Sequence, residues 1–128
     1  MSGDYTNRAF SLTMVIPGAF STGDGQACVR CPADAILMDV EFSIGTLGGT
    51  SGSTELMLRN DTDTLDMLAS VSSIAYDADP KCASAASLHA TEANRILDKG
   101  DVIEVDVDTV CNGAAEADLT VNVLLKGI

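Results

Sequence analysis

Five carboxylates fall within the twelve residues of LDKGDVIEVDVD, a density that could hold a metal ion or supply catalytic acids. From Ile103 onward, however, aliphatic residues alternate strictly with acids, which is the pattern of a β-strand buried on one face. Successive acids on one face of a strand lie roughly 6.5–7 Å apart, too far for neighbours to share a calcium ion. We therefore expect a strand whose acids, Glu104, Asp106 and Asp108, face solvent.

Two other groups of acids lie in expected loops and offer the oxygen ligands that calcium prefers. Aspartate is also common in turns, where its side chain bonds to nearby backbone amides. The turn interpretation needs less special geometry, so we expect neither a metal ion nor a cofactor. The two groups are Asp61, Asp63 and Asp66, and Asp77 and Asp79.

Four cysteines could bind zinc or form disulfides. Cys28 and Cys31 would lie about 10 Å apart on opposite faces of an extended strand. Cys82 and Cys111 are too far apart in sequence to supply a second close pair of zinc ligands. We expect free, mostly buried thiols. Disulfides in an extracellular particle stay open as the alternative, since the sequence does not choose among the pairings.

The sequence offers few combinations of residues that could form a catalytic site. His89 is the only histidine, no G-x-S-x-G motif surrounds a serine, and LGGTSGS lacks the lysine of a phosphate-binding loop. A glycosidase with paired carboxylates generally holds its sugar with aromatic side chains, and this chain has two Tyr, three Phe and no Trp. We expect a protein that is not an enzyme.

The net charge of −12 is unevenly distributed. Acids and bases balance in residues 1–32, so residues 33–128 carry the whole negative charge. Nucleic-acid binding needs clustered Lys and Arg, and an anionic membrane would repel this acidic part. No signal peptide and no apolar run long enough to span a membrane are visible. We expect neither nucleic acid nor membrane as a partner, and a protein made in a cytoplasm.

Alternating apolar residues predict the strands that position these groups. Strands are expected over 9–16, 33–45, 100–110 and 118–128, with a hairpin of four-residue connection over 53–70. Residues 18–26 should form a loop, and 71–100 a long connection with a short strand or one helical turn. The residues expected to face inward include Phe10, Leu12, Met14, Ile16, Ile36, Met38, Val40, Phe42, Ile44, Leu56, Leu58, Leu65, Met67, Ala69, Leu119, Val121, Val123 and Leu125.

Seven to nine short strands separated by Gly, Asp and Asn turns, without βαβ spacing, indicate an all-β fold. We predict an antiparallel β-sandwich, jelly-roll-like, in a single domain. Because aromatic residues make up only 4% of the chain, its core must consist mainly of aliphatic side chains and methionine.

The segments LMLRNDTDTLDML, LDKGDVIEVDVDTV and ADLTVNVLLKG resemble the small β-sandwich virion structural proteins of tailed bacteriophages, of the head decoration or cement type. The resemblance covers residues 35–128. It implies a capsid decoration subunit, commonly a homotrimer, that stabilises a phage head by binding the major capsid protein, in a virion assembled in the host cytoplasm. The alternatives are a tail or fibre component and a jelly-roll carbohydrate- or receptor-binding module, although few aromatics are present to bind sugar.

A leading segment of nearly zero net charge, residues 1–25, precedes an acidic β-sandwich body, residues 26–128. We expect this segment to act as an arm that reaches onto a neighbouring subunit, for example by adding a strand to an exposed sheet edge. Its candidate contact residues are Tyr5, Arg8 and Phe10. The alternative is a frayed terminus followed by an ordinary first strand.

Overall fold

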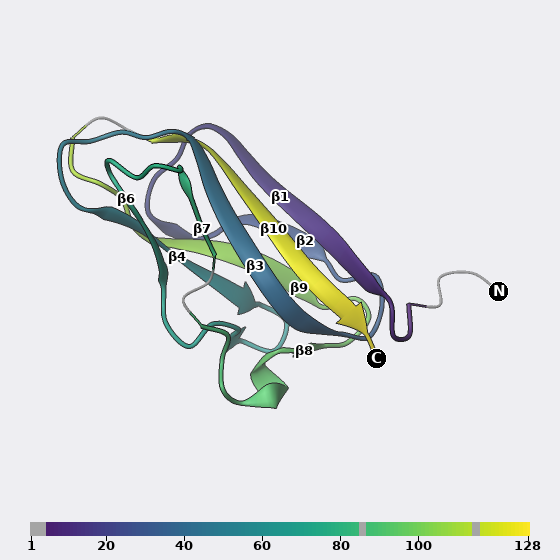
Figure 1. Ribbon diagram of the computed structural model, residues 1–128. Coiled ribbons are helices and arrows are strands. Elements are labelled where there is room, and N and C mark those ends of the chain that lie inside the picture. Colours follow the sequence, from purple (N-terminus) through teal and green to yellow (C-terminus); the bar gives the residue numbers. More distant parts are fainter. Residues whose placement is uncertain (1–4, 85–86, 114–115) are drawn as a thin grey trace.

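Two antiparallel sheets face each other in the computed structural model, which describes residues 5–84, 87–113 and 116–128 (Figure 1). This arrangement confirms the predicted all-β antiparallel sandwich. The first sheet has the order β1 (Ala9–Ala19), β10 (Ala117–Gly127), β3 (Ala35–Thr46), with the short strands β7 (Cys82–Ser84) and β8 (Ile96–Leu97) on β3. The second has the order β2 (Gly23–Arg30), β9 (Val102–Thr109), β4 (Ser53–Asn60), with β5 (Leu65–Asp66) and β6 (Ser72–Ala75) on β4.

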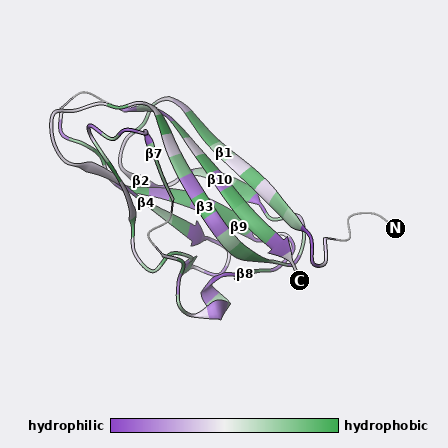
Figure 2. Ribbon diagram, in the orientation of Figure 1, coloured by the Kyte–Doolittle hydropathy of each residue, from purple (hydrophilic) through white to green (hydrophobic). Residues whose placement is uncertain are grey.

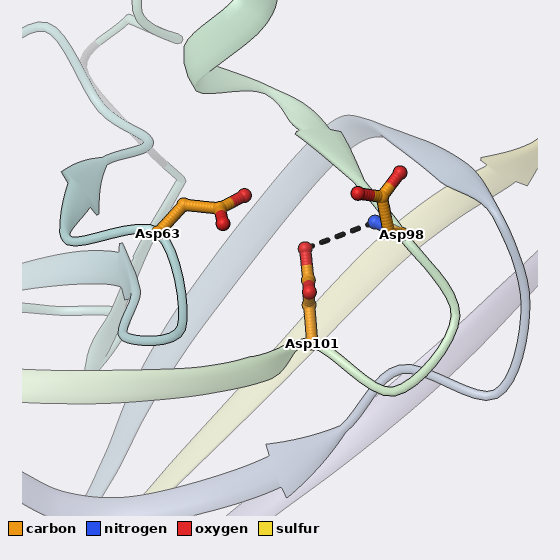
Figure 3. Close-up of side chains that lie close together, drawn as sticks. All are labelled: Asp63, Asp98 and Asp101. Carbon is orange, nitrogen blue, oxygen red and sulfur yellow. Dashed lines mark hydrogen bonds between the residues drawn. The ribbon is translucent and has the colours of Figure 1, made fainter.

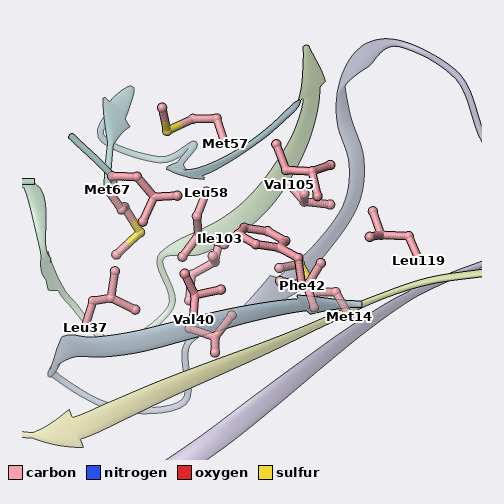
Figure 4. Close-up of a cluster of buried hydrophobic side chains, with 14 of the residues drawn as sticks. Met14, Leu37, Val40, Phe42, Met57, Leu58, Met67, Ile103, Val105 and Leu119 are labelled. Carbon is pink, nitrogen blue, oxygen red and sulfur yellow. The ribbon is translucent and has the colours of Figure 1, made fainter. Parts of the chain in front are cut away.

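Apolar side chains from both sheets fill the space between them (Figure 4), and apolar and polar residues alternate along the strands (Figure 2). The core is mainly aliphatic with several methionines, as predicted, and Phe42 at its centre is fully buried. Burial of this apolar surface is the main stabilising contribution to such a fold. The predicted inward residues of the strands β4, β9 and β10 are all buried: Leu56, Leu58, Ile103, Val105, Val107, Leu119, Val121, Val123 and Leu125.

The inward face of β3 changes partway along the strand. Our prediction was wrong at Ile36 and Met38, because their neighbours Ala35 and Leu37 are buried instead, and Met38 is 47% exposed. The register against β10 skips one residue at Met38. Such a β-bulge reverses which side chains face the core. From Val40 onward the predicted alternation holds.

The loop predicted over 18–26 is shorter than expected. Strand β1 continues to Ala19, and β2 already begins at Gly23 and pairs with β9. The sequence GDGQACVR shows no sustained apolar alternation. In the structure, β2 pairs irregularly between Gly23 and Ala27 and exposes most of its residues, so little of the strand needs to be apolar. A periodicity argument misses such a strand.

The predicted hairpin is present, and Asn60 pairs with Leu65 across the four-residue connection 61–64. Its second strand, β5, is only two residues long, and Ala69 is exposed rather than inward. Residues 71–100 contain β6, β7, a 3-10 turn over Glu92–Asn94 and β8, more elements than we predicted. The described part of the chain has no helix long and apolar enough to cross a lipid bilayer.

Strand β1 belongs to the first sheet along most of its length. Ala9 pairs with Lys126 and Ile16 pairs with Leu119. Residues 9–19 are thus a structural strand of the sandwich, and the described residues before Ala9 lie at its end (Figure 1).

Candidate functional site

The three predicted contact residues lie together at the start of β1. The rings of Tyr5 and Phe10 are 4.8 Å apart between centroids, and the Arg8 amide donates to Tyr5 O across 2.9 Å. The Asn7 amide donates to Gly127 O, and a side chain at Gly127 would collide with Tyr5 O. Arg8 itself is exposed. The fold therefore groups the three residues, and their contact with a partner stays a prediction.

Strand β1 forms one edge of the first sheet. It pairs with β10 on one side, and in the described ranges no strand pairs with its other side. No residue of AFSLTMVIPGA carries a charge. Edge strands usually carry charges, prolines or bulges that block pairing with another chain. Here Pro17 and an irregular pairing after Ile16 protect only the end of the strand, so residues 9–16 form an open edge.

The outward surface of the first sheet, which we call the first-sheet face, is nearly neutral. It also carries Val15, Met38 and Leu124, three large apolar side chains that are 41–55% exposed. A hollow of about 200 Å³ lies on this face, lined by polar side chains around Leu124. The residues of the face are Ser11, Thr13, Val15, Met38, Asp39, Glu41, Thr120, Asn122, Leu124 and Lys126.

The outward surface of the second sheet, the second-sheet face, is acidic. Its acids outnumber its two bases, Arg30 and Arg59, so its charge has the same sign as that of the whole chain. The two faces of one small sandwich therefore differ in charge. The acids of the second-sheet face are Asp24, Glu55, Asp66, Glu104, Asp106 and Asp108.

Two of these acids are more buried than we predicted. Asp106 is 6% exposed, and its Oδ1 accepts a hydrogen bond of 2.8 Å from the Gly25 amide. The Glu104 side chain is 13% exposed, with Oε1 3.9 Å from Arg59 Nε. The prediction of a solvated acidic face was wrong here because the backbone at Gly25 lies over both carboxylates. Asp108 is exposed as expected.

The pKa of Glu104 is raised to about 7, first by burial and then by the nearby carboxylates of Asp106 and Asp61 and a side-chain hydrogen bond with Asp106, whereas Arg59 lowers it. Burial and then Asp106 also raise the pKa of Asp108. A carboxyl that holds its proton near neutral pH beside another carboxyl is the pairing that glycosidases use. At Glu104, however, the covering backbone would first have to move away before a substrate could enter.

A second group of acids lies where two turns meet at one end of the sandwich (Figure 3). Carboxylate oxygens of Asp63, Asp98 and Asp101 are all within 4.8 Å of one another. In the sequence Asp63 lies beside Asp61 and Asp66. The fold instead joins it to two residues of LDKGD that are distant in sequence.

The buried member of this group is already satisfied by the protein. Asp101 Oδ2 accepts hydrogen bonds from the Asp98 amide at 2.9 Å and from Asn60 Nδ2 at 3.2 Å. Asn60 Nδ2 also donates to Asp63, and Asn60 Oδ1 accepts from the Asp63 amide. Three carboxylates are a ligand set that suits a divalent cation. These hydrogen bonds explain the group as a link that holds the two turns together, with the fully buried Asn60 at its centre.

All four cysteines are free. Cys28 is exposed, Cys82 is intermediate, and Cys31 and Cys111 are buried. Burial raises the pKa of the thiols of Cys31 and Cys111, which keeps them protonated and unreactive. Within the described ranges, the cysteines join no cluster of three ligands that could hold zinc.

His89 makes a local contact. Its Nδ1 accepts a hydrogen bond of 3.1 Å from the Thr91 amide, inside the turn that precedes the 3-10 segment. This bond explains the residue as part of a turn.

Sequence reasoning missed a buried carboxylate at Glu116, which is 1% exposed. Its Oε1 accepts from the Cys111 amide at 2.8 Å, and its Oε2 accepts from Thr54 Oγ1. The Cys111 thiol bonds to the same carboxylate. Within NGAAEA this glutamate has the appearance of a surface turn residue, and no local pattern marks it as buried.

No model of a known protein family matches the chain, and a search of curated proteins finds no match either.

Proposed function

We propose that this chain is a non-enzymatic structural subunit of a virion, a decoration or cement protein that stabilises a phage head by binding the major capsid protein. The observation that carries the proposal is the difference between the two faces of the sandwich. One is nearly neutral and ends in an open edge, and the other is acidic. A subunit that covers a shell needs one surface for the shell and another for solvent.

The fold supports the proposal. The chain crosses repeatedly between the sheets: β1 to β4 alternate between the first and the second sheet, β9 pairs beside β4 in the second, and β10 returns to the first. Such crossing between two sheets is the arrangement of a jelly roll, an architecture of viral capsid proteins. We propose that the sandwich is of this type.

The two faces would act through ordinary contacts. The first-sheet face and the residues around Tyr5 would bury apolar area against the shell. The acidic second-sheet face would stay hydrated and keep decorated particles apart by charge repulsion. The buried thiols and covered carboxylates fit a role in stability rather than turnover.

The proposal is tested by co-sedimentation of the purified chain with capsids assembled from the major capsid protein encoded in the same genome. We expect saturable binding with a fixed ratio of copies. Arg8→Glu, beside the first-sheet face, should weaken binding, whereas Arg30→Glu, with the same charge change on the second-sheet face, should leave it unchanged.

Two results would contradict the proposal. The first is failure of the wild-type chain to sediment with capsids. The second is density for the chain on the tail instead of the head in a reconstruction of the intact particle, which would make it a tail or fibre component.

A further inference from the structure

We propose that the open edge of β1 is a self-association site, where β1 of one copy pairs antiparallel with β1 of a second copy across a two-fold axis at Leu12. This contact goes beyond the proposed function and does not depend on it. It would join the first sheets of two sandwiches into one continuous sheet.

The backbone groups needed for such pairing point the right way. The Gly127 amide donates to Arg8 O, which places the even-numbered residues of β1 in hydrogen-bonded pairs with β10. The alternation of a strand then turns the amides and carbonyls of the odd-numbered residues toward the open edge. These residues are Ala9, Ser11, Thr13 and Val15.

The side chains at this edge leave apolar surface uncovered. Met14 is buried, but Phe10, Leu12 and Ile16, which face inward from the same strand, are only partly buried where the sandwich ends. A second copy would extend the core over them. This additional burial would add a hydrophobic contribution to that of the backbone hydrogen bonds.

Charge selects a second copy as the occupant. Two chains of net charge −12 repel each other, so a contact between them is favourable only where neither presents acids. Strand β1 has no charged residue over eleven positions. The edge strand of the second sheet, β2, contains Asp24 and Arg30, and the other edge strands among the described residues are at most four residues long. Only β1 offers a long uncharged edge in the described part of the chain.

The register of the pairing is the one in which the backbone groups of all four outward residues form hydrogen bonds with the other copy. An axis at Leu12 places Ala9 opposite Val15 and Ser11 opposite Thr13 of the other copy. The hydroxyl pair lies on the outer side of the sheet, where such pairs are favourable in antiparallel strands. A shift of the axis to Thr13 would place Ala9 opposite Pro17, which has no amide hydrogen to donate.

Light scattering coupled to size exclusion tests the contact through the mass of the purified full chain over a range of concentrations. We expect the mass of two chains at high concentration. Thr13→Lys places two ammonium groups near the axis and should raise the dissociation constant roughly tenfold or more. Ser73→Lys is the matched control, an exposed position on the edge strand β6 of the second sheet, and should keep the wild-type mass.

Cross-linking provides a second measurement that does not rely on weakening the contact. In a Cys28→Ser background, Leu12→Cys should form a disulfide-linked dimer on mild copper-phenanthroline oxidation, because facing residues at the axis lie about 4.5 Å apart between Cα atoms. Phe10→Cys, on the same side of the same strand, should not, since it faces Met14 of the other copy.

Several results would overturn the proposal: a mass of one chain at every concentration, a mass of three chains, equal masses for Thr13→Lys and wild type in folded protein, or equal cross-linking at positions 10 and 12. Capsid binding is measured in a separate experiment, so the self-association proposal and the proposed function can fail independently of each other.

Discussion

The Gly25 amide and the Asp106 carboxylate are joined by a 2.8 Å hydrogen bond between β2 and β9. This donor satisfies Asp106 in its buried position, whereas Glu104, on the same side of β9, has Arg59 at 3.9 Å and a side-chain hydrogen bond with Asp106 that favours its protonated form. Of the two acids it is Glu104 whose pKa rises to about 7. The ionisation of Glu104 is therefore coupled to the stability of the sandwich.

The first prediction concerns the pH dependence of stability. The pKa of Glu104 rises from 4.5 to about 7 on folding, so between these values the folded chain keeps a proton that the unfolded chain has lost. The contribution of this group is present at low pH and is lost as pH rises through that window. Glu104→Gln should flatten the decline and stabilise the protein at pH 8 by on the order of 1–3 kcal/mol.

Chemical denaturation at several pH values checks this expectation. The control is Glu92→Gln, an exposed acid in the 3-10 segment. It should leave the curve parallel to that of the wild type. If Glu104→Gln gave the same parallel curve, the covered acid would have no part in the pH dependence.

The second prediction concerns the buried carboxylate of Glu116. Glu116→Ala would leave the Cys111 amide and the Thr54 hydroxyl without their acceptor, so we expect a loss of about 2–4 kcal/mol in unfolding free energy. Glu116→Gln keeps one acceptor oxygen and should lose less. Urea unfolding measures both, and a loss below about 0.5 kcal/mol for alanine would rule out the network as a stabilising feature.

Strand periodicity predicted the buried residues correctly in some strands and failed in others. The strands β4, β9 and β10 bury the residues that alternation selects. Each of them pairs with strands on both sides and packs one face on the core. Alternation failed at Met38, where a bulge adds a residue, and in β2, which is polar and irregularly paired. Bulges and irregular pairing depend on the partner strand and leave no local signal.

The candidate sites were predicted less well than the fold. The grouping of Asp63 with Asp98 and Asp101 depends on two turns that meet only in three dimensions. The burial of Glu116 and the cover over Asp106 depend on strands from other parts of the chain, β4 with Thr54 and β2 with Gly25. Such contacts between distant segments are set by topology, which periodicity does not determine.

The third prediction concerns the hydrogen bonds by which Asn60 links the two turns. Asn60→Ala removes the donors to Asp63 and Asp101 and should cost about 1–3 kcal/mol, since the site is fully buried. Asn60→Asp adds a fourth carboxylate and should cost more at neutral pH than at pH 4. Asn122→Ala, an exposed amide on the first-sheet face, serves as the control. Equal stability of the three variants would contradict the role of Asn60.

The fourth prediction concerns the order in which the thiols react with a disulfide reagent such as DTNB. Cys28 is exposed and should react first, and Cys28→Ser should remove this fast phase. The buried thiols Cys31 and Cys111, whose pKa values burial raises, should react only as the protein unfolds, so denaturant should bring their rates to that of Cys28. Cys82, of intermediate exposure, should react between them. Four equal rates in native protein would mean that the sandwich opens faster than the reagent attacks, which would contradict the tight packing around the buried thiols.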